Sequence, residues 1–354
     1  IAQRTTENDG DWSLQFVVLK NTAEADLMIR VGDIDNLGFG FEEAFNPFSG
    51  RSTWSHGFPW DIKKDDAKGT DRIMVPSSYK YGTWVSQDGY TSSTQRPSNQ
   101  PMTIAIPLAE LKGVKVDSAS LQLFIDDFQA PALNSKFQVK INGLRFTEAE
   151  KLINRVNQTG PVGKLITIRL TPELLEKLKA DSLVIAIDDP VSKQGDGYAV
   201  DFVKLLINPK VIYQGKVQGR IIDATTKEPI AGATAIIEDY GTAITDNEGN
   251  FIIENVPAGL SIVSGSAAGY SSETKQVDVI ADESSELVEL ELKRSGKVTF
   301  NNKVLQEGDN LVLNNIQFEV NSATLLAAGR AELDKLAAFM KQNVGIEILL
   351  SGHT

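Results

Sequence analysis

The sequence predicts a mainly β protein: an N-terminal antiparallel β-sandwich, a second β-sandwich and then an incomplete α/β layer. Three observations lead to this prediction. The chain of 354 residues is too long for one ordinary sandwich domain. Short strand-like runs separated by turn residues recur through most of it, whereas a long amphipathic helix pattern occurs near the C-terminus. Changes in composition divide the chain into residues 1–213, 214–294 and 295–354.

The composition excludes several classes of protein. A total of 35 basic against 47 acidic residues gives a net charge of −12, which argues against nucleic-acid binding. No apolar run approaches the roughly 20 residues of a membrane-spanning helix. The absence of cysteine excludes disulfides, thiolate metal sites and an acylated N-terminal cysteine. Residues 215–294 carry a net charge of −8, which indicates a solvated strand face.

The first segment contains the strand-like runs expected of an antiparallel sandwich. They lie at residues 14–19, 26–31, 102–107, 120–125, 137–141, 165–170, 183–187 and 198–207. A short helix is expected after Thr171, which is a suitable N-cap, because Pro172 fits the first helical position. Between the second and third strands, residues 32–96 form a long aromatic stretch. A loop of this length predicts a functional region, in which Trp54, Trp60 and Trp84 either stack sugar rings or form loop cores.

Acidic residues at strand ends predict a metal site. Asp33 and Asp35 precede a glycine in a pattern that can wrap a hard cation, although Leu37 and Ala44 exclude an EF-hand. Strict alternation along the strand at 198–207 turns Asp201 inward, where a carboxylate requires a cation or a hydrogen-bond donor. We therefore expect a Ca²⁺ site formed by the carboxylates Asp33, Asp35, Asp71, Asp196 and Asp201.

Two other readings of these carboxylates remain open. They could form ordinary Asx turns, with one aspartate paired to Arg30 or Arg72. Alternatively, two of them could act as the acid and base of a glycosidase, for which the candidates are Asp33, Asp35, Asp126 and Asp188.

The second segment carries a series of turn and strand motifs. They are Val217-Gln218-Gly219-Arg220, Glu228-Pro229-Ile230-Ala231-Gly232, Asp246-Asn247-Glu248-Gly249, Asn255-Val256-Pro257-Ala258-Gly259 and Ala268-Gly269-Tyr270. The second of these turns the chain, and the third is a tight hairpin turn. Residues 215–293 resemble the carboxypeptidase-regulatory-like domain, a seven-stranded transthyretin-like sandwich. The resemblance implies a rigid, non-catalytic spacer or a partner-binding module.

The third segment predicts a strand, a helix and a strand. Leu333, Leu336, Ala337 and Met340 give the helix at 327–342 an apolar stripe, and 344–350 reads as a buried strand. The motifs Ile316-x-Phe318, Asn321-Ser322 and Gly352-His353-Thr354 resemble the OmpA-like peptidoglycan-binding domain. The resemblance implies a partial peptidoglycan site at Asn321, His353 and Thr354, and a natural protein that continues past Thr354.

Together these features lead us to expect a non-enzymatic cell-envelope protein of a Gram-negative bacterium, in the periplasm or at the outer membrane. It would tether an outer-membrane or periplasmic protein partner to peptidoglycan through the OmpA-like segment, without a transmembrane span of its own. The alternative is a surface adhesin that binds carbohydrate in a calcium-dependent manner through the first sandwich.

Overall fold

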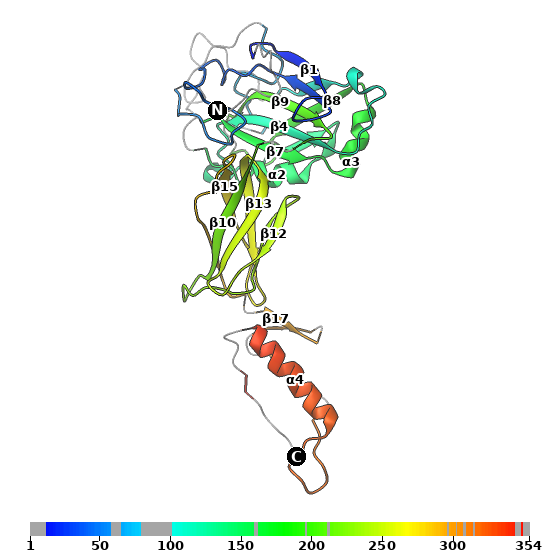
Figure 1. Cartoon of the computed structure of the whole chain (residues 1–354), viewed down its shortest axis with the longest axis vertical. Helices are drawn as coiled ribbons and strands as arrows, with labels where there is room; N and C mark the ends of the chain where they lie inside the picture. The colour runs from blue at the N-terminus through cyan, green and yellow to red at the C-terminus, as the bar shows by residue number, and fades with distance from the viewer. Residues whose placement is uncertain are drawn as a thin grey trace.

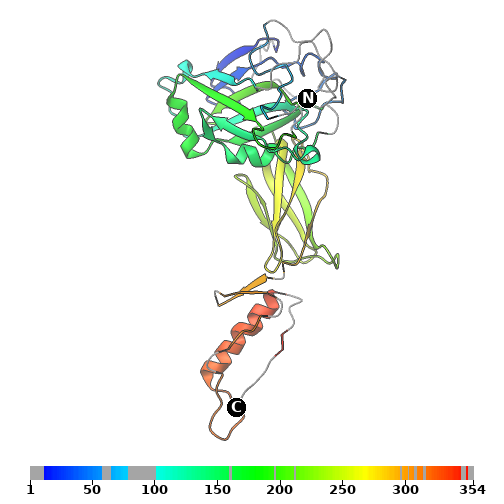
Figure 2. The same cartoon turned by 180° about the vertical axis from the view of Figure 1, so that it is seen from behind.

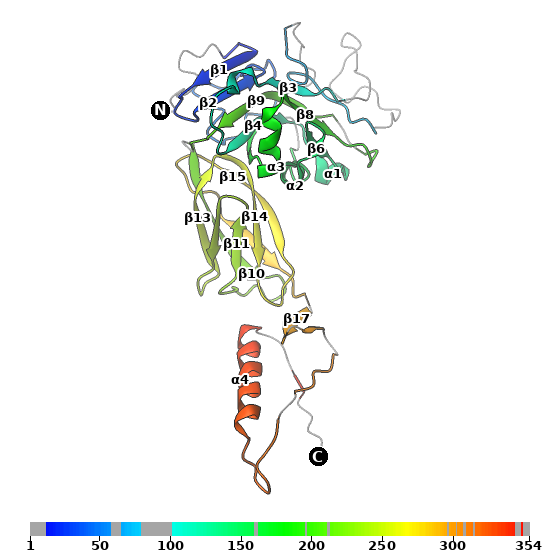
Figure 3. The same ribbon diagram turned by 90° about the vertical axis from the view of Figure 1, so that its right-hand side faces the viewer.

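The fold is mainly β, as predicted, and its parts follow one another along the long axis of the molecule (Figures 1 and 2). The computed structural model describes residues 12–57, 65–78, 101–158, 162–194, 197–210, 213–295, 297–301, 303–306, 309–313, 316–343 and 348–349. The N-terminal sandwich lies at one end, the second sandwich in the middle and the segment with the long helix at the other end (Figure 3).

The larger sheet of the first sandwich has the order β1-β2-β9-β4-β7 and is antiparallel between these neighbours. Its strands are β1 (Phe16–Lys20), β2 (Leu27–Val31), β9 (Ala199–Ile207), β4 (Ala119–Asp126) and β7 (Lys164–Arg169). The central strands β2 and β9 are buried along their length, including the charged residues Arg30, Asp201 and Lys204.

The second sheet packs against the first and has the order β3-β8-β5-β6. Its strands are β3 (Ile104–Pro107), β8 (Ser182–Asp188), β5 (Gln138–Ile141) and β6 (Leu144–Arg145). In β3 and β8 buried residues alternate with more exposed ones, as expected of strands with one face in the core. The expected strands therefore form, with ends that differ by one or two residues.

Short helices connect these strands. They are η1 (Ala109–Leu111), α1 (Ala130–Leu133), α2 (Thr147–Ile153), α3 (Pro172–Leu175) and η2 (Glu176–Lys179). The expected cap of α3 is confirmed, because the Thr171 hydroxyl accepts a hydrogen bond from the Leu174 N–H. The helices α1 and α2 were not predicted, since a helix of one or two turns carries too little apolar periodicity to be recognised.

The second sandwich contains seven strands. They are β10 (Gln214–Asp223), β11 (Thr234–Ile237), β12 (Gly241–Ile244), β13 (Asn250–Pro257), β14 (Gly259–Ser266), β15 (Glu273–Val279) and β16 (Val288–Leu292). One layer has the order β13-β10-β16, and the other contains β15, β14, β11 and β12. The predicted tight turn between β12 and β13 is present, with the Gly249 N–H donating to the Asp246 carbonyl. The prediction of a hairpin there is wrong, because β12 pairs with β11 in one layer and β13 pairs with β10 in the other.

The two sandwiches share a backbone connection. Strand β14 pairs in parallel with β7 through Leu260 and Ile166, so the larger sheet continues from the first sandwich into the second. A salt bridge of 2.6 Å joins Lys164 to Asp278 across the junction. The Ala281 N–H also donates to the Ser49 carbonyl.

The third segment contains a hairpin and a helix. The hairpin of β17 (Lys297–Phe300) and β18 (Lys303–Gln306) was not predicted, whereas α4 (Ala327–Gln342) has the predicted bounds. The first expected strand is reduced to a bridge between Phe318 and Leu325. The strand expected at 344–350 is wrong for Ile348 and Leu349, which lie in no strand, and its other residues lie outside the described part.

Candidate metal centre

Four aspartates from three separate segments meet at one end of the larger sheet. Asp33 and Asp35 follow the end of β2, Asp201 lies near the start of the neighbouring strand β9, and Asp71 lies in the loop that crosses them. One carboxylate oxygen from each lies within 4.8 Å of the others. Asp71 is placed by its backbone N–H, which donates to the Val200 carbonyl. The antiparallel pairing of β2 with β9 thus brings together residues that are distant in sequence.

Gly32 permits the close approach of the loop to β9. It has a φ of +86°, and a Cβ atom at this position would lie 2.3 Å from the Asp201 carbonyl oxygen. Only glycine fits such a position without displacement of the backbone. The chain can therefore turn directly after β2 and direct Asp33 toward Asp201.

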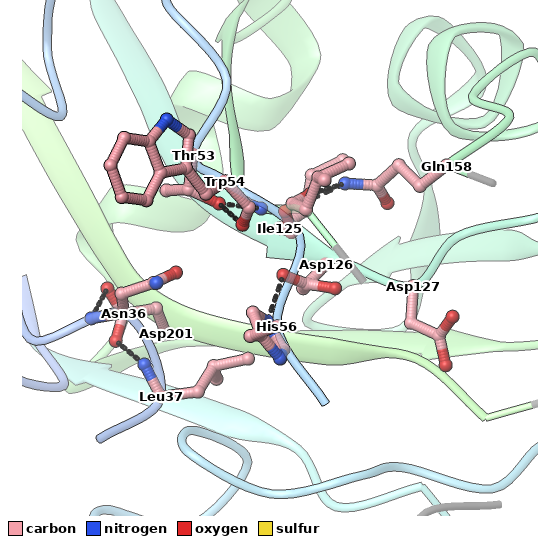
Figure 4. A network of polar contacts seen from close by, with 12 residues as sticks. Asn36, Leu37, Thr53, Trp54, His56, Ile125, Asp126, Asp127, Gln158 and Asp201 are labelled. Atoms are coloured by element: carbon pink, nitrogen blue, oxygen red, sulfur yellow. Dashed lines mark hydrogen bonds and ion pairs between the residues drawn. The ribbon is translucent and has the colours of Figure 1, made fainter. Parts of the chain in front are cut away.

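The turn that follows contains two residues in the left-handed region, Asn36 (φ 59°) and Leu37 (φ 58°). Their N–H groups donate to the Asp201 carboxylate, at 3.2 and 2.9 Å (Figure 4). The Asp35 carboxylate accepts the Gly38 N–H at 2.6 Å. Left-handed backbone at non-glycine residues is costly and persists where surrounding contacts impose it. In this turn the carboxylates of Asp201 and Asp35 provide those contacts, because they accept hydrogen bonds from its N–H groups.

The metal-free cluster is electrostatically unfavourable. Asp71 is 4% exposed, and neither of its carboxylate oxygens accepts a hydrogen bond from an N–H or hydroxyl group; the group they face is the Asp201 carboxylate. Burial, together with the charges of Asp201 and Asp33, raises the pKa of Asp71 well above its usual range. Burial also raises the pKa of Asp201 to about 8, despite the N–H that Leu37 donates to it. Two ionised carboxylates cannot donate to each other, so a proton or a cation is required between them.

The donor set is suited to a hard cation. Ca²⁺ binds oxygen ligands at about 2.3–2.6 Å, so ligands on opposite sides of the ion are about 5 Å apart. The observed limit of 4.8 Å matches that span. The cluster found among the described residues contains carboxylates and no histidine, whereas zinc prefers nitrogen or sulfur ligands. These residues therefore fit a Ca²⁺ ion, with water or backbone carbonyls completing its coordination.

Four of the five predicted ligands, Asp33, Asp35, Asp71 and Asp201, are brought together, and Asp196 lies outside the described residues. Among the arginines considered as partners, Arg72 donates to the backbone carbonyls of Thr70 and Asp66, and Arg30 donates to that of Leu14. Asp201 is buried as expected, at 1% exposure, along with every other residue of β9.

Asp126 and Asp188 lie apart from the cluster. Asp188 accepts hydrogen bonds from the backbone and hydroxyl of Ser77. Asp126 accepts from His56, a residue that sequence reasoning did not single out (Figure 4). The only signal for His56 was that it is one of two histidines in the chain. Its partner could not be inferred, because the pair joins a loop to a strand 70 residues away.

The remaining predicted residues are less informative. Asn321 is exposed in the turn between Phe318 and Leu325, with a φ of 56°. His353 and Thr354, expected to complete the partial peptidoglycan site, lie outside the described residues, as do Trp60 and Trp84. Trp54 is described and is 75% exposed.

Comparison with known proteins identifies one domain. Residues 217–301 match the family model described as the CarboxypepD_reg-like domain. The match supports the resemblance of this segment to the carboxypeptidase-regulatory-like domain. No OmpA-like domain is found by the same comparison, and no curated protein matches the chain. Among the described residues, no helix has the length and apolar character needed to cross a bilayer.

Several solved structures show distant likeness. One is a type II cohesin–X-dockerin complex from Acetivibrio cellulolyticus, with 19% identity, a TM-score of 0.21 and coverage of 36% of this chain and 94% of that chain. A minor pilin of Streptococcus agalactiae has 15% identity, a TM-score of 0.22 and coverage of 52% of this chain and 87% of that chain. A putative carbohydrate-binding protein from Bacteroides uniformis has 14% identity, a TM-score of 0.18 and coverage of 22% of this chain and 40% of that chain. Likeness at this level says nothing of what this chain binds.

Proposed function

We propose that the first sandwich is a non-enzymatic module that binds Ca²⁺ and holds a surface-binding region in shape, as in a calcium-dependent adhesin. One observation carries the proposal: four carboxylates lie within 4.8 Å, and neither oxygen of buried Asp71 accepts a hydrogen bond from an N–H or hydroxyl group. An isolated carboxylate taken out of water is costly unless it is paired or coordinates a metal. A divalent cation provides that compensation.

The proposed cation would join three segments that are far apart in sequence. Asp33 and Asp35 hold the loop after β2, Asp71 holds the crossing loop, and Asp201 belongs to the central strand β9. Its binding would replace carboxylate repulsion by attraction and fix the loops at this end of the sheet. The exposed indole of Trp54 lies in a loop that reaches the same end, where Asp126 closes β4, and offers an aromatic face suited to carbohydrate.

Isothermal titration calorimetry tests the proposal. Protein treated with EDTA should bind one Ca²⁺ per chain, and its thermal midpoint should rise with Ca²⁺ concentration. Asp71→Asn and Asp33→Asn should weaken binding at least tenfold, whereas Asp188→Asn, which changes a carboxylate outside the cluster, should leave it unchanged. The absence of calcium binding by the unmodified protein, or equal affinity in all variants, would exclude the site.

The carbohydrate part of the proposal has a separate test. A glycan array should detect calcium-dependent binding that Trp54→Ala reduces, while the calcium affinity of this variant stays the same. Glycan binding that persists in EDTA would show that carbohydrate recognition does not depend on the bound cation. No binding to any glycan would leave the cation with a purely structural role.

A second proposed function is the tethering of an envelope partner to peptidoglycan by the third segment. The agreement of α4 with the expected helix, next to the Phe318–Leu325 bridge, supports it. Sedimentation with purified peptidoglycan sacculi should recover the full-length natural protein and not a version cut after residue 295. Equal recovery of both would show that the third segment does not bind the wall.

A further inference from the structure

A buried ion pair lies at the same end of the sheet as the cation cluster. His56 Nε2 is 3.0 Å from Asp126 Oδ2, and the two side chains are 7% and 2% exposed. Asp126 ends strand β4, which adjoins β9, the strand that carries Asp201. The ion pair and the cluster therefore occupy neighbouring strand ends.

Both ring nitrogens of His56 face acceptors. Nε2 faces the Asp126 carboxylate, and Nδ1 lies 3.2 Å from the Gly57 carbonyl oxygen. A neutral imidazole has a single N–H, so only the doubly protonated ring can donate both hydrogen bonds. Asp126 is a charged group that pairs with this ring. Burial raises the pKa of Asp126, and the bond from His56 opposes that rise.

The ring of His56 also stacks on Phe39, with centroids 4.0 Å apart and planes at 18°. Phe39 belongs to the turn 35–40, which three bonds make compact. The Phe39 N–H donates to the Asn36 carbonyl at 3.0 Å, the Gly40 N–H donates to the Asp35 carbonyl at 2.7 Å, and the Asn36 side chain donates to the Gly40 carbonyl at 3.0 Å. The same turn supplies the N–H groups bonded to Asp201.

These contacts form a continuous connection from Asp126 through His56 and Phe39 to the turn and on to the cluster. The turn is thus held on one side by Asp201 and on the other by the stacked ring. Its left-handed residues Asn36 and Leu37 require such support.

We propose that His56 is a positioning residue of the cation site: held as an imidazolium between Asp126 and the Gly57 carbonyl, it fixes Phe39 and thereby the turn that orients Asp35 and Asp201. This inference rests on the proposed Ca²⁺ site. It adds a supporting residue that lies outside the four carboxylates.

The expected effect on binding follows from the behaviour of residues that support metal ligands. Loss of such a residue weakens metal binding by about 10–100-fold. Since His56 acts through Phe39, we expect His56→Ala and Phe39→Ala each to weaken Ca²⁺ binding by about tenfold. Asp188→Asn alters a carboxylate outside the cluster, bonded to Ser77, and should leave the affinity unchanged.

Nuclear magnetic resonance provides a readout that a general loss of stability would not reproduce. The chain has two histidines, and His353→Gln removes the other signal. Titration of this variant with Ca²⁺ should shift the His56 ring resonances.

Calorimetry on the folded variants completes the test. Asp126→Asn serves as a second variant if His56→Ala does not fold, and it should also weaken Ca²⁺ binding. The inference is wrong if His56→Ala and Asp126→Asn bind Ca²⁺ as tightly as the unmodified protein does and the His56 resonances do not change on addition of Ca²⁺. The proposed cation site would still be supported in that case, because the unmodified protein binds Ca²⁺. If the unmodified protein binds no Ca²⁺, the proposed function itself is wrong.

Discussion

Asp71 contributes to cation binding at a cost to the stability of the metal-free protein. Both of its oxygens are buried without a hydrogen bond from an N–H or hydroxyl group, beside carboxylates that repel it. Asp71→Asn removes one charge and adds a donor that Asp33 or Asp201 can accept. We expect this variant to be about 1–3 kcal/mol more stable than the unmodified protein in EDTA near pH 7.5, and to gain less stability than the unmodified protein at the same Ca²⁺ concentration. Thermal and urea unfolding measure both effects, and a variant less stable in EDTA would contradict them.

The raised pKa of Asp201 predicts how the stability of the metal-free protein depends on pH. The folded-state pKa of about 8 exceeds the ordinary value of 3.8. Between these values the folded state holds a proton that the unfolded state releases, so the free energy of unfolding falls as pH rises from about 4 to 8. Saturating Ca²⁺ should reverse this trend, because it binds the ionised carboxylates. Urea unfolding at several pH values in EDTA and in Ca²⁺ checks the sign, and parallel profiles would contradict it.

At the residue scale, sequence reasoning succeeds where a carboxylate interrupts an apolar pattern. Asp201 was expected to turn inward because Val203, Leu205 and Ile207 share its face, and it is buried. His56 carried no such signal, since its burial depends on Asp126 and on Phe39 from the cation turn. A local pattern can identify a strained charge but cannot identify the distant residue that compensates it.

The turn after β2 offers a matched comparison of two glycines. Gly32 and Gly38 have nearly equal φ values, +86° and +85°, but an added Cβ would meet the Asp201 carbonyl at Gly32 and nothing within 4 Å at Gly38. Gly38→Ala should therefore cost about 1 kcal/mol of stability through backbone strain alone. Gly32→Ala should cost at least twice as much and also weaken Ca²⁺ binding. Equal losses measured by thermal unfolding would show that the close approach to β9 is not required.

At the element scale, strands and the long helix could be predicted because their residues share one periodicity. The strands of both sandwiches and α4 are such cases. Helix α2 escaped recognition because its seven residues gain their burial from packing against β5 rather than from a repeated apolar stripe. The shape of the loop at 32–96 could not be predicted, since many of its described contacts are with other segments, as in the bonds of Thr53 to Gly163 and of Asp71 to Val200.

For the whole molecule, the sequence indicated separate sandwiches but not the way they are joined. Gly50, in the first sandwich, has a φ of +83°, and a Cβ there would lie 2.0 Å from the Val279 carbonyl and 2.6 Å from the Gly259 nitrogen. Gly259 in turn approaches the Leu165 carbonyl of β7. Two glycines that read as ordinary turn residues thus permit direct backbone contact between the sandwiches.

This contact predicts that the two sandwiches form a single rigid unit. Gly50→Ala should force the backbones apart, break the Ala281–Ser49 hydrogen bond and expose the Lys164–Asp278 salt bridge to solvent. Amide hydrogen exchange at β14, β15 and the adjoining edge of β7 should then increase, while exchange in β2 and β9 stays the same. Gly232→Ala is the matched control, because Gly232 also has a positive φ of +71° but has nothing within 4 Å. If both variants exchange like the unmodified protein at β14 and β15, the sandwiches are held by something other than this junction. If the junction opens in Gly50→Ala alone, the close backbone approach at Gly50 is what holds the two sandwiches together.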